Sequence, residues 1–259
     1  MNIKPLILVT NDDGYKAPGL GLIAEAARQF GDVVVVAPAK GQSGMSHAVT
    51  LMEPIRYKLK QQEEGFSVYS CSGTPADCVK IALNQILDRR PDMIISGINH
   101  GSNSSVSLFY SGTVAACIEG CMNGIPSIAL SVDDHSPEAD FRLAIKYSER
   151  IISETIRNGL PEYTCLNVNF PRIPPEECRG IMVCRQTMGV WKEEFEHRVD
   201  PLGKDYYWLT GYFSSLEPDD EDTDAWALQH NYAAVVPIKV DVTNHGALGI
   251  ISKWNLNNL

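Results

Sequence analysis

Leu6-Ile7-Leu8-Val9-Thr10-Asn11-Asp12-Asp13-Gly14 begins as an unbroken apolar run and leads into two adjacent carboxylates. Such a run is typical of a strand buried on both faces of a parallel sheet, and α/β proteins bind ligands where such strands end. Two neighbouring carboxylates repel each other, which favours a site where a cation neutralises them. Asp-Gly is also ordinary turn chemistry. A divalent-metal site and a simple turn therefore both remain open for Asp12 and Asp13.

Segments with strand character and helix character alternate over the first two-thirds of the chain. Short apolar or β-branched runs predict strands at 6–10, 33–36, 66–70, 92–96, 127–131, 164–169, 181–184 and 233–238. Helical periodicity or helix-start signals lie between them, at 19–28, 73–87, 111–123 and 141–156. This alternation predicts an α/β fold with a doubly wound, mostly parallel sheet flanked by helices.

The pattern changes between residues 186 and 230. Aromatic residues alternate with charged residues there, and no helical period emerges. This composition predicts a β-hairpin excursion that packs on a partner subunit or covers the site. The acidic stretch 217–224 lacks the glycine and the final glutamate of a calcium-binding loop, so we expect a solvated loop.

Composition narrows the classes of partner. The 259-residue chain has a formal net charge of −10, which disfavours duplex nucleic acid or an anionic membrane. Small phosphorylated substrates remain compatible, because one bound metal ion reverses the local field. The seven cysteines include no Cys-x-x-Cys pair, which favours reduced thiols, a cytoplasmic location and no zinc site. No apolar run reaches the roughly 18 residues that a membrane span needs.

One glycine motif is misleading. Gly19–Ala24 matches the dinucleotide pattern G-x-G-x-x-A, but it begins nine residues after Thr10, whereas that pattern directly follows its strand. Ala37 and Pro38 stand where an acidic residue would bind the ribose. The chain also has no P-loop sequence. A dinucleotide oxidoreductase and a P-loop enzyme are therefore both disfavoured.

Oxygen donors follow three of the predicted strands. Asp12 and Asp13 follow the first strand. Ser43 lies in a glycine-flanked loop after the second, and Asn99 lies in the polar loop after the strand at 92–96. Each residue alone has an ordinary structural interpretation. Together they form an all-oxygen set of the kind that suits Mg²⁺ or Mn²⁺ and leaves positions for water.

Ser111-Gly112-Thr113 begins a predicted helix, where free backbone N–H groups and the helix dipole favour a phosphate. A plain serine N-cap is the alternative. His47 and His100 are predicted at the same edge of the sheet, where either could be a general acid for a leaving alcohol or could have a structural role.

With these residues in view, the chain resembles the SurE family, the stationary-phase survival nucleotidases, over essentially its whole length. The resemblance is carried by Ile7–Gly14, Val36–Pro38, Gln42–Gly44, Ser72–Val79, Ser96–Asn103, Tyr110–Ala116, Glu119–Gly120 and Leu166–Pro171. Asp224 resembles an acidic residue of the family ahead of the last core strand. The tail from Ile250 to Leu259 does not match closely.

The resemblance implies a 5'/3'-nucleotidase, a metal-dependent phosphomonoesterase of nucleoside 5'- and 3'-monophosphates, with exopolyphosphatase activity in some members. It implies one Mg²⁺ or Mn²⁺ per subunit, with ligands at Asp12, Asp13, Ser43 and Asn99. It places phosphate-side groups at Asn103, Ser111, Gly112 and Thr113, and we add Asn11 to the substrate-binding candidates. The catalytic candidates are Asp12, Asp13, Asn99 and Ser111.

The resemblance also implies a Rossmann-like core in three α/β/α layers, with C-terminal elements exchanged in a homodimer or homotetramer. We therefore expect a catalytic core at 1–185, rejoined by about 232–243, and a hairpin and tail for oligomer contacts at 186–231 and 244–259. Together they would form one functional unit.

The sequence is compatible with two mechanisms and with a second function class. Direct attack by water is favoured over a phospho-aspartate intermediate, because Asp12-Asp13 lacks the Asp-x-Asp spacing of the aspartate-nucleophile phosphatases. Asp13 is the candidate acceptor of the water's proton. The alternative function is a non-catalytic binding protein that responds to a nucleotide or metal on the same fold.

Overall fold

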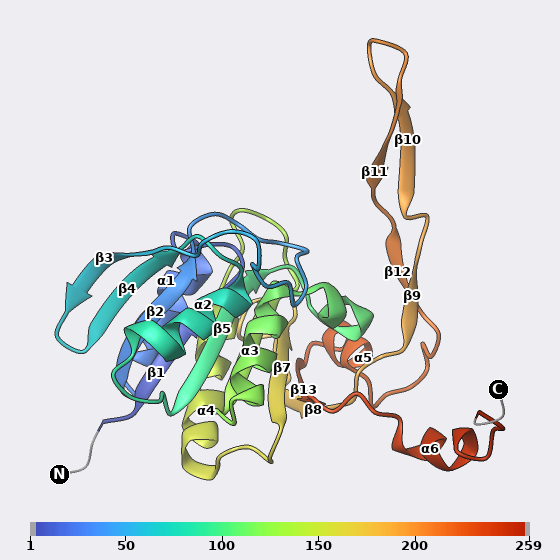
Figure 1. Ribbon diagram of the computed structural model, residues 1–259. Coiled ribbons are helices and arrows are strands. Elements are labelled where there is room, and N and C mark those ends of the chain that lie inside the picture. Colours follow the sequence, from blue (N-terminus) through green and yellow to red (C-terminus); the bar gives the residue numbers. More distant parts are fainter. Residues whose placement is uncertain (1–3, 257–259) are drawn as a thin grey trace.

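The computed structural model describes residues 4–256, and a mostly parallel sheet forms its centre (Figure 1). The nine strands of this sheet have the order β3-β4-β2-β1-β5-β6-β7-β13-β8, and β3 (Tyr57–Glu63) is the outermost strand at one side. Six neighbouring strands are parallel: β4 (Phe66–Cys71), β2 (Asp32–Pro38), β1 (Leu6–Thr10), β5 (Met93–His100), β6 (Ser127–Val132) and β7 (Thr164–Phe170). At the far edge, β13 (Ala233–Lys239) is antiparallel to β7, and β8 (Ile181–Val183) is parallel to β13. The predicted α/β class and mostly parallel sheet are confirmed.

Helices cover both faces of the sheet, as the alternating sequence predicted. On one face lie α1 (Pro18–Ala27) and α4 (Arg142–Asn158), and on the other lie α2 (Pro75–Ile81) and α3 (Gly112–Met122). The alternation of side chains along β1 explains the two layers, since Ile7 and Val9 pack with α1 and Leu8 packs with α2. Burial on both sides accounts for the unbroken apolar run of this strand.

The misleading glycine motif has a packing role in this arrangement. Gly19 lies in α1, where a Cβ atom would come within 2.3 Å of the carbonyl oxygen of Ile98 on β5. Only glycine allows the helix to lie this close to the strand without a shift.

Three elements had no clear signal in the sequence. The edge strand β3 (Tyr57–Glu63) is exposed along its whole length, so it lacks the apolar alternation that marks a half-buried strand. The short helices α5 (Asp224–Gln229) and α6 (His245–Ile251) were not predicted either. Helix α5 packs on β13 through Ala227 and Leu228, although it lies within the range expected for the excursion.

The predicted hairpin excursion is confirmed as a long two-stranded ribbon that points away from the core (Figure 1). Near the core, β9 (Gly189–Lys192) pairs with β12 (Tyr212–Ser215), and beyond them β10 (Phe195–Val199) pairs with β11 (Asp205–Leu209), in both cases antiparallel. Its use in oligomer contacts stays a prediction. Residues 1–3, and 257–259 of the predicted exchange tail, lie outside the described residues.

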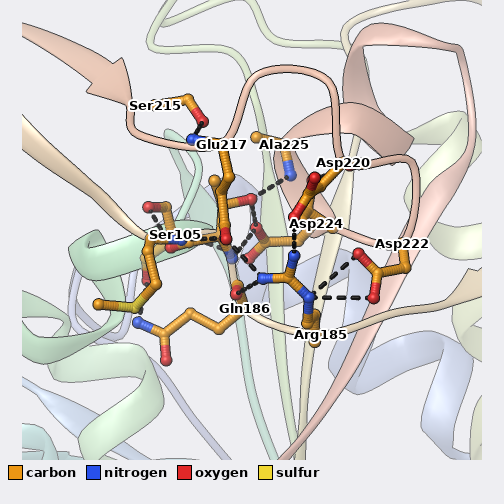
Figure 2. Close-up of polar contacts among 12 residues, drawn as sticks. Ser105, Arg185, Gln186, Ser215, Glu217, Asp220, Asp222, Asp224 and Ala225 are labelled. Carbon is orange, nitrogen blue, oxygen red and sulfur yellow. Dashed lines mark hydrogen bonds and ion pairs between the residues drawn. The ribbon is translucent and has the colours of Figure 1, made fainter.

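The acidic stretch at 217–224 gathers around one arginine where the excursion leaves the core (Figure 2). The guanidinium of Arg185 pairs with the carboxylates of Glu217 and Asp220, both at 2.6 Å, and with that of Asp222 at 3.0 Å. Asp224 is fully buried and accepts hydrogen bonds from the backbone N–H of Ser105 at 2.7 Å and of Thr187 at 2.9 Å. These carboxylates therefore hold the base of the excursion to the core.

No helix within residues 4–256 is long and apolar enough to cross a membrane.

Candidate active site

The turn after β1 is closed by Asn11. The side chain of Asn11 is fully buried, donates to the carbonyl oxygen of Gly14 and accepts from its N–H, both at 3.1 Å. Gly14 has φ +104°, which favours glycine. Both polar atoms of this predicted substrate-binding residue thus shape the loop that presents Asp12 and Asp13.

The carboxylates of Asp12 and Asp13 lie where β1 meets β5 and α3. Asp12 is buried, and its Oδ1 accepts a hydrogen bond from the hydroxyl of Thr113. Asp13 Oδ2 accepts from the backbone N–H of His100 at 3.4 Å. Burial raises the pKa of both carboxyls, and the charge of Asp13 raises that of Asp12 further. Within residues 4–256, neither carboxylate forms an ion pair with a basic side chain.

The loop after β2 brings the hydroxyl of Ser43 to this edge. The N–H of Gln42 donates to the carbonyl oxygen of Asp12 at 2.7 Å, so the chain next to Ser43 is tied to the carboxylate turn. Farther along, Ser46 N–H donates to the carbonyl oxygen of Tyr110 at 3.1 Å. Ser43 itself is exposed and therefore accessible to a ligand.

β5 and the loop after it supply two buried amides. The Nδ2 of Asn99 donates to the carbonyl oxygen of Gly101 at 2.8 Å. This bond does not use Asn99 Oδ1, an oxygen that can accept a hydrogen bond or bind a cation. The Nδ2 of Asn103 donates to Ser131 Oγ at 2.8 Å, and its backbone N–H donates to Asn169 Oδ1 at 2.8 Å. Both amides are therefore fixed in place by the neighbouring backbone and strands.

The start of α3 lies against Asp12. Ser111 is the N-cap residue, since its hydroxyl accepts from the N–H of Val114 at 3.1 Å. A Cβ atom on Gly112 would lie 2.9 Å from the Cβ of Asp12, so glycine allows the close approach. The hydroxyl of Thr113 donates to Asp12 Oδ1, and its role toward a phosphate stays a prediction. The first N–H groups of such a helix have no partner within the helix and can bind an anion.

A cavity of about 530 Å³ unites the candidates. Its walls include Asp12, Ser43, Asn99, Asn103 and Ser111. The predicted site residues outside its walls are Asn11, Asp13, Gly112 and Thr113, which stand directly behind or beside Asp12. β2, β1 and β5 are neighbouring parallel strands, so the loops that follow them meet at the same edge of the sheet. The cavity lies there, beside the start of α3.

The two histidines differ in their surroundings. His100 lines the cavity, packs edge-on against Phe141 with ring centroids 5.0 Å apart, and contacts the carbonyl oxygen of Ser136 through Nδ1 at 3.1 Å. His47 lies outside this cavity, where its Nε2 is 3.3 Å from Glu119 Oε2 on α3. Of the two general-acid candidates, only His100 therefore lies in the wall of the cavity.

Sequence reasoning did not single out several side chains that also line the cavity, among them His135 and Trp191. His135 follows β6, and Trp191 belongs to β9 of the excursion. Neither lies in a motif, and only the folded hairpin brings Trp191 beside residues from the sheet edge. The general expectation that the excursion covers the site was the one available signal.

The chemistry of the donors fits a hard divalent cation. Within residues 4–256, no group of three or more His, Cys, Asp or Glu side chains could hold a metal ion. The site instead offers two carboxylates, the hydroxyl of Ser43 and the amide oxygen of Asn99. Mg²⁺ and Mn²⁺ accept a few oxygen ligands completed by water, so this donor set suits them better than it suits zinc.

Comparison with known proteins places the chain among close relatives. Residues 7–193 match the family described as Survival protein SurE. A protein named 5'-nucleotidase SurE from Phocaeicola vulgatus is 47% identical over 253 residues, covering 98% of each chain. One of the same name from Flavobacterium psychrophilum is 48% identical over 255 residues, covering 98% of this chain and 99% of its own.

A solved structure agrees with these sequence relatives. The crystal structure of the SurE protein from Aquifex aeolicus superposes with a TM-score of 0.83 and is 38% identical, covering 96% of this chain and 98% of its own. The fold is therefore shared, and the chain belongs to the SurE family.

Proposed function

We propose that this protein is a metal-dependent phosphomonoesterase that hydrolyses nucleoside 5'- and 3'-monophosphates to nucleoside and phosphate. The observation that carries the proposal is one cavity that joins the buried carboxylate of Asp12, next to which Asp13 stands, to the start of α3. A cation beside the carboxylates and an anion at the helix start are complementary halves of a phosphate site. The relatives named 5'-nucleotidase support the nucleotide as substrate.

We assign the cation to Asp12, Asp13, Ser43 and Asn99, with one Mg²⁺ or Mn²⁺ per subunit. When bound, the ion would supply positive charge that polarises the phosphoryl group and acidifies water. The buried position of Asp12 and the hydrogen bond from Thr113 fix the carboxylate before any ligand arrives. Such fixed geometry avoids reorganisation during the reaction.

The remaining polar groups would bind and orient the phosphoryl oxygens. The N–H groups at the start of α3, beside Ser111, and the amide of Asn103 face negative charge as it spreads in the transition state. Asp13 Oδ2 would accept the proton of the attacking water, and His100, in the cavity wall, would protonate the leaving alcohol. This is direct hydrolysis, without a phosphorylated aspartate.

The test is phosphate release from a panel of nucleoside 5'- and 3'-monophosphates and short polyphosphate, with Mg²⁺, Mn²⁺ or EDTA. We expect turnover of nucleotides only with a metal ion present. No phosphate release with any ion would overturn the enzyme assignment and leave a binding protein. A phosphorylated enzyme trapped during turnover would overturn direct hydrolysis.

We further propose a homodimer or homotetramer that exchanges C-terminal elements, in the reducing cytoplasm. Large apolar side chains lie exposed on one face of the outer hairpin, among them Phe195, Val199 and Tyr207, which suits a protein contact. All seven cysteines are free thiols, which suits a reducing compartment. Light scattering of the full chain would measure the number of subunits, and a monomer at micromolar concentration would contradict the assembly.

A further inference from the structure

The cavity at the candidate active site has two sides that come from different parts of the chain. The side formed by the sheet edge holds the carboxylate of Asp12 and the amides of Asn99 and Asn103. The opposite side comes from the excursion and consists of Trp191, Glu194, Leu209 and Thr210, which lie around the junction of its two ladders. A phosphate needs only the side at the sheet edge, so the second side lies where the rest of a substrate would extend.

Trp191 stands at the boundary between this cavity and another. The second cavity, also about 530 Å³, shares Ser102, Ser107, His135 and Trp191 with the first. The two cavities therefore adjoin at the indole ring. A nucleoside that extended from the first cavity toward the second would lie against this ring.

The indole ring is held in place before any ligand binds. Trp191 is paired with Phe213 across the β9–β12 ladder, and the two rings meet edge-on, with centroids 6.4 Å apart and planes 70° apart. Phe213 packs so closely over Gly189 that a Cβ atom there would lie 2.3 Å from the ring. Trp191 keeps 37% of its surface exposed. An ordered, partly exposed aromatic ring is suited to stacking.

We propose that Trp191 is the platform on which the nucleobase stacks, and that it sets the affinity for nucleotides over base-free phosphate esters. This inference rests on the proposed function. Stacking on an aromatic face tolerates any base, since every base has a π-face. Trp191 is thus a specificity residue remote from the reacting atoms, and its loss raises KM while leaving kcat nearly unchanged.

The test uses the full chain with Mg²⁺ and compares Trp191→Ala with Trp208→Ala. Trp208 is a matched control, since it is an exposed tryptophan of the same excursion and lines neither cavity. We expect Trp191→Ala to raise KM for AMP about tenfold, equivalent to about 1.4 kcal/mol of lost stacking. Inhibition by inorganic phosphate, which probes the side at the sheet edge alone, stays at the wild-type level. Trp191→Phe keeps most of the affinity for AMP.

Three outcomes would contradict the proposal that Trp191 is the platform. One is an unchanged KM for AMP in Trp191→Ala. Another is an equal weakening of phosphate inhibition, which would indicate a disturbed site rather than lost stacking. The third is a rise in KM with Tyr110→Ala alone, which would move the platform to the other large aromatic ring of the cavity wall.

Failure of the proposed function is a separate result. If the wild-type protein releases no phosphate from AMP, the nucleotidase assignment fails whatever the variants do. Stacking on Trp191 is then tested by measuring how far AMP quenches the tryptophan fluorescence. Quenching retained in Trp208→Ala and lost in Trp191→Ala would support it, and quenching retained in both would reject it.

Discussion

The sheet edge, where β1, β2 and β5 end beside the cavity, differs from the hairpin excursion in how its residues are buried and held in place. At the edge, Asp12, Asn99 and Asn103 are buried and held by hydrogen bonds. Asp12 accepts from the hydroxyl of Thr113, the side chain of Asn99 donates to the carbonyl oxygen of Gly101, and the N–H of Asn103 donates to Asn169 Oδ1. The strands β10 and β11 are exposed at every residue and are held chiefly to each other. The edge can therefore keep reacting groups in fixed positions, whereas the excursion provides an exposed surface for binding.

The difference suggests a division of labour. Chemistry that depends on positions accurate to fractions of an ångström belongs on the rigid edge, while recognition of the base and of other subunits tolerates more movement. The connection between the two regions runs through Asp224 and Arg185 at the base of the excursion. Substitutions in the two regions should therefore have separable effects on turnover and on stability.

The largest effect is expected from Asp12→Asn combined with Asp13→Asn. Loss of both charges removes the cation site, and we expect activity to fall on the order of 10³-fold or more. Because burial raises the pKa of both carboxyls, their charged forms are costly in the metal-free protein. The variant should therefore unfold at an equal or higher temperature in EDTA. Thermal melts in EDTA and with Mn²⁺ measure this, and a strongly destabilised variant would contradict it.

A second effect at the edge is expected from Thr113→Val, which keeps the shape of the side chain but removes the hydroxyl that donates to Asp12. Partners of metal ligands typically contribute about 10–100-fold to metal affinity or activity. We expect a higher Mg²⁺ concentration for half-maximal activity and an unchanged fold. Thr113→Ser, which restores the hydroxyl, is the matched control. Equal metal dependence in both variants would show that this hydroxyl acts elsewhere.

At the base of the excursion, Asp224→Asn should lower stability more than activity. The buried carboxylate accepts hydrogen bonds from the N–H of Ser105 and from the N–H and hydroxyl of Thr187. An amide cannot accept at its NH₂ group, so one buried donor loses its partner, at a cost of about 2 kcal/mol. Urea unfolding measures the loss. Asp222→Asn, a more exposed control, should change little, and equal effects would contradict the burial argument.

The sequence predicted the central strands that end at the site far better than the outlying elements, for physical reasons. The run before Asp12 is buried on both faces, and Val33–Val36 is buried except for half-buried Val34. Burial imposes the apolar pattern from which strands are predicted. β3 is the outermost strand of the sheet and is exposed, so the core does not constrain its sequence. Helix α5 is only six residues long, too short for a period to emerge.

The candidate site divides in the same way. Asp12, Ser43 and Asn99 were predicted to meet because parallel strands end at one edge, a rule that needs no coordinates. The contact of Thr113 with Asp12 could not be predicted, since it depends on how close α3 approaches β1 at Gly112. The position of Trp191 depends on the direction of a hairpin, which no local pattern sets.

The smallest effect concerns how firmly the Ser43 loop is held to α3. Glu119, on α3, contacts His47 of that loop and Lys80 of α2, at 3.3 and 2.8 Å. Burial raises the pKa of Glu119, but the hydrogen bonds from His47 and Lys80 outweigh it, so the pKa lies below its ordinary value. A lowered folded pKa stabilises the protein above the unfolded pKa of about 4.3, and this contribution disappears as the pH falls through the folded pKa.

Glu119→Gln should therefore lower the melting temperature at pH 7 and lose that effect as the pH falls below about 4. The lysine partner is 48% exposed, so solvent screens the pair and we expect about 1 kcal/mol or less. Repeating the comparison in a His47→Gln background separates the contact of Glu119 with Lys80 from its contact with His47. An equal deficit at both pH values would mean that Glu119 acts by packing, and that the Ser43 loop is held by its backbone hydrogen bonds alone.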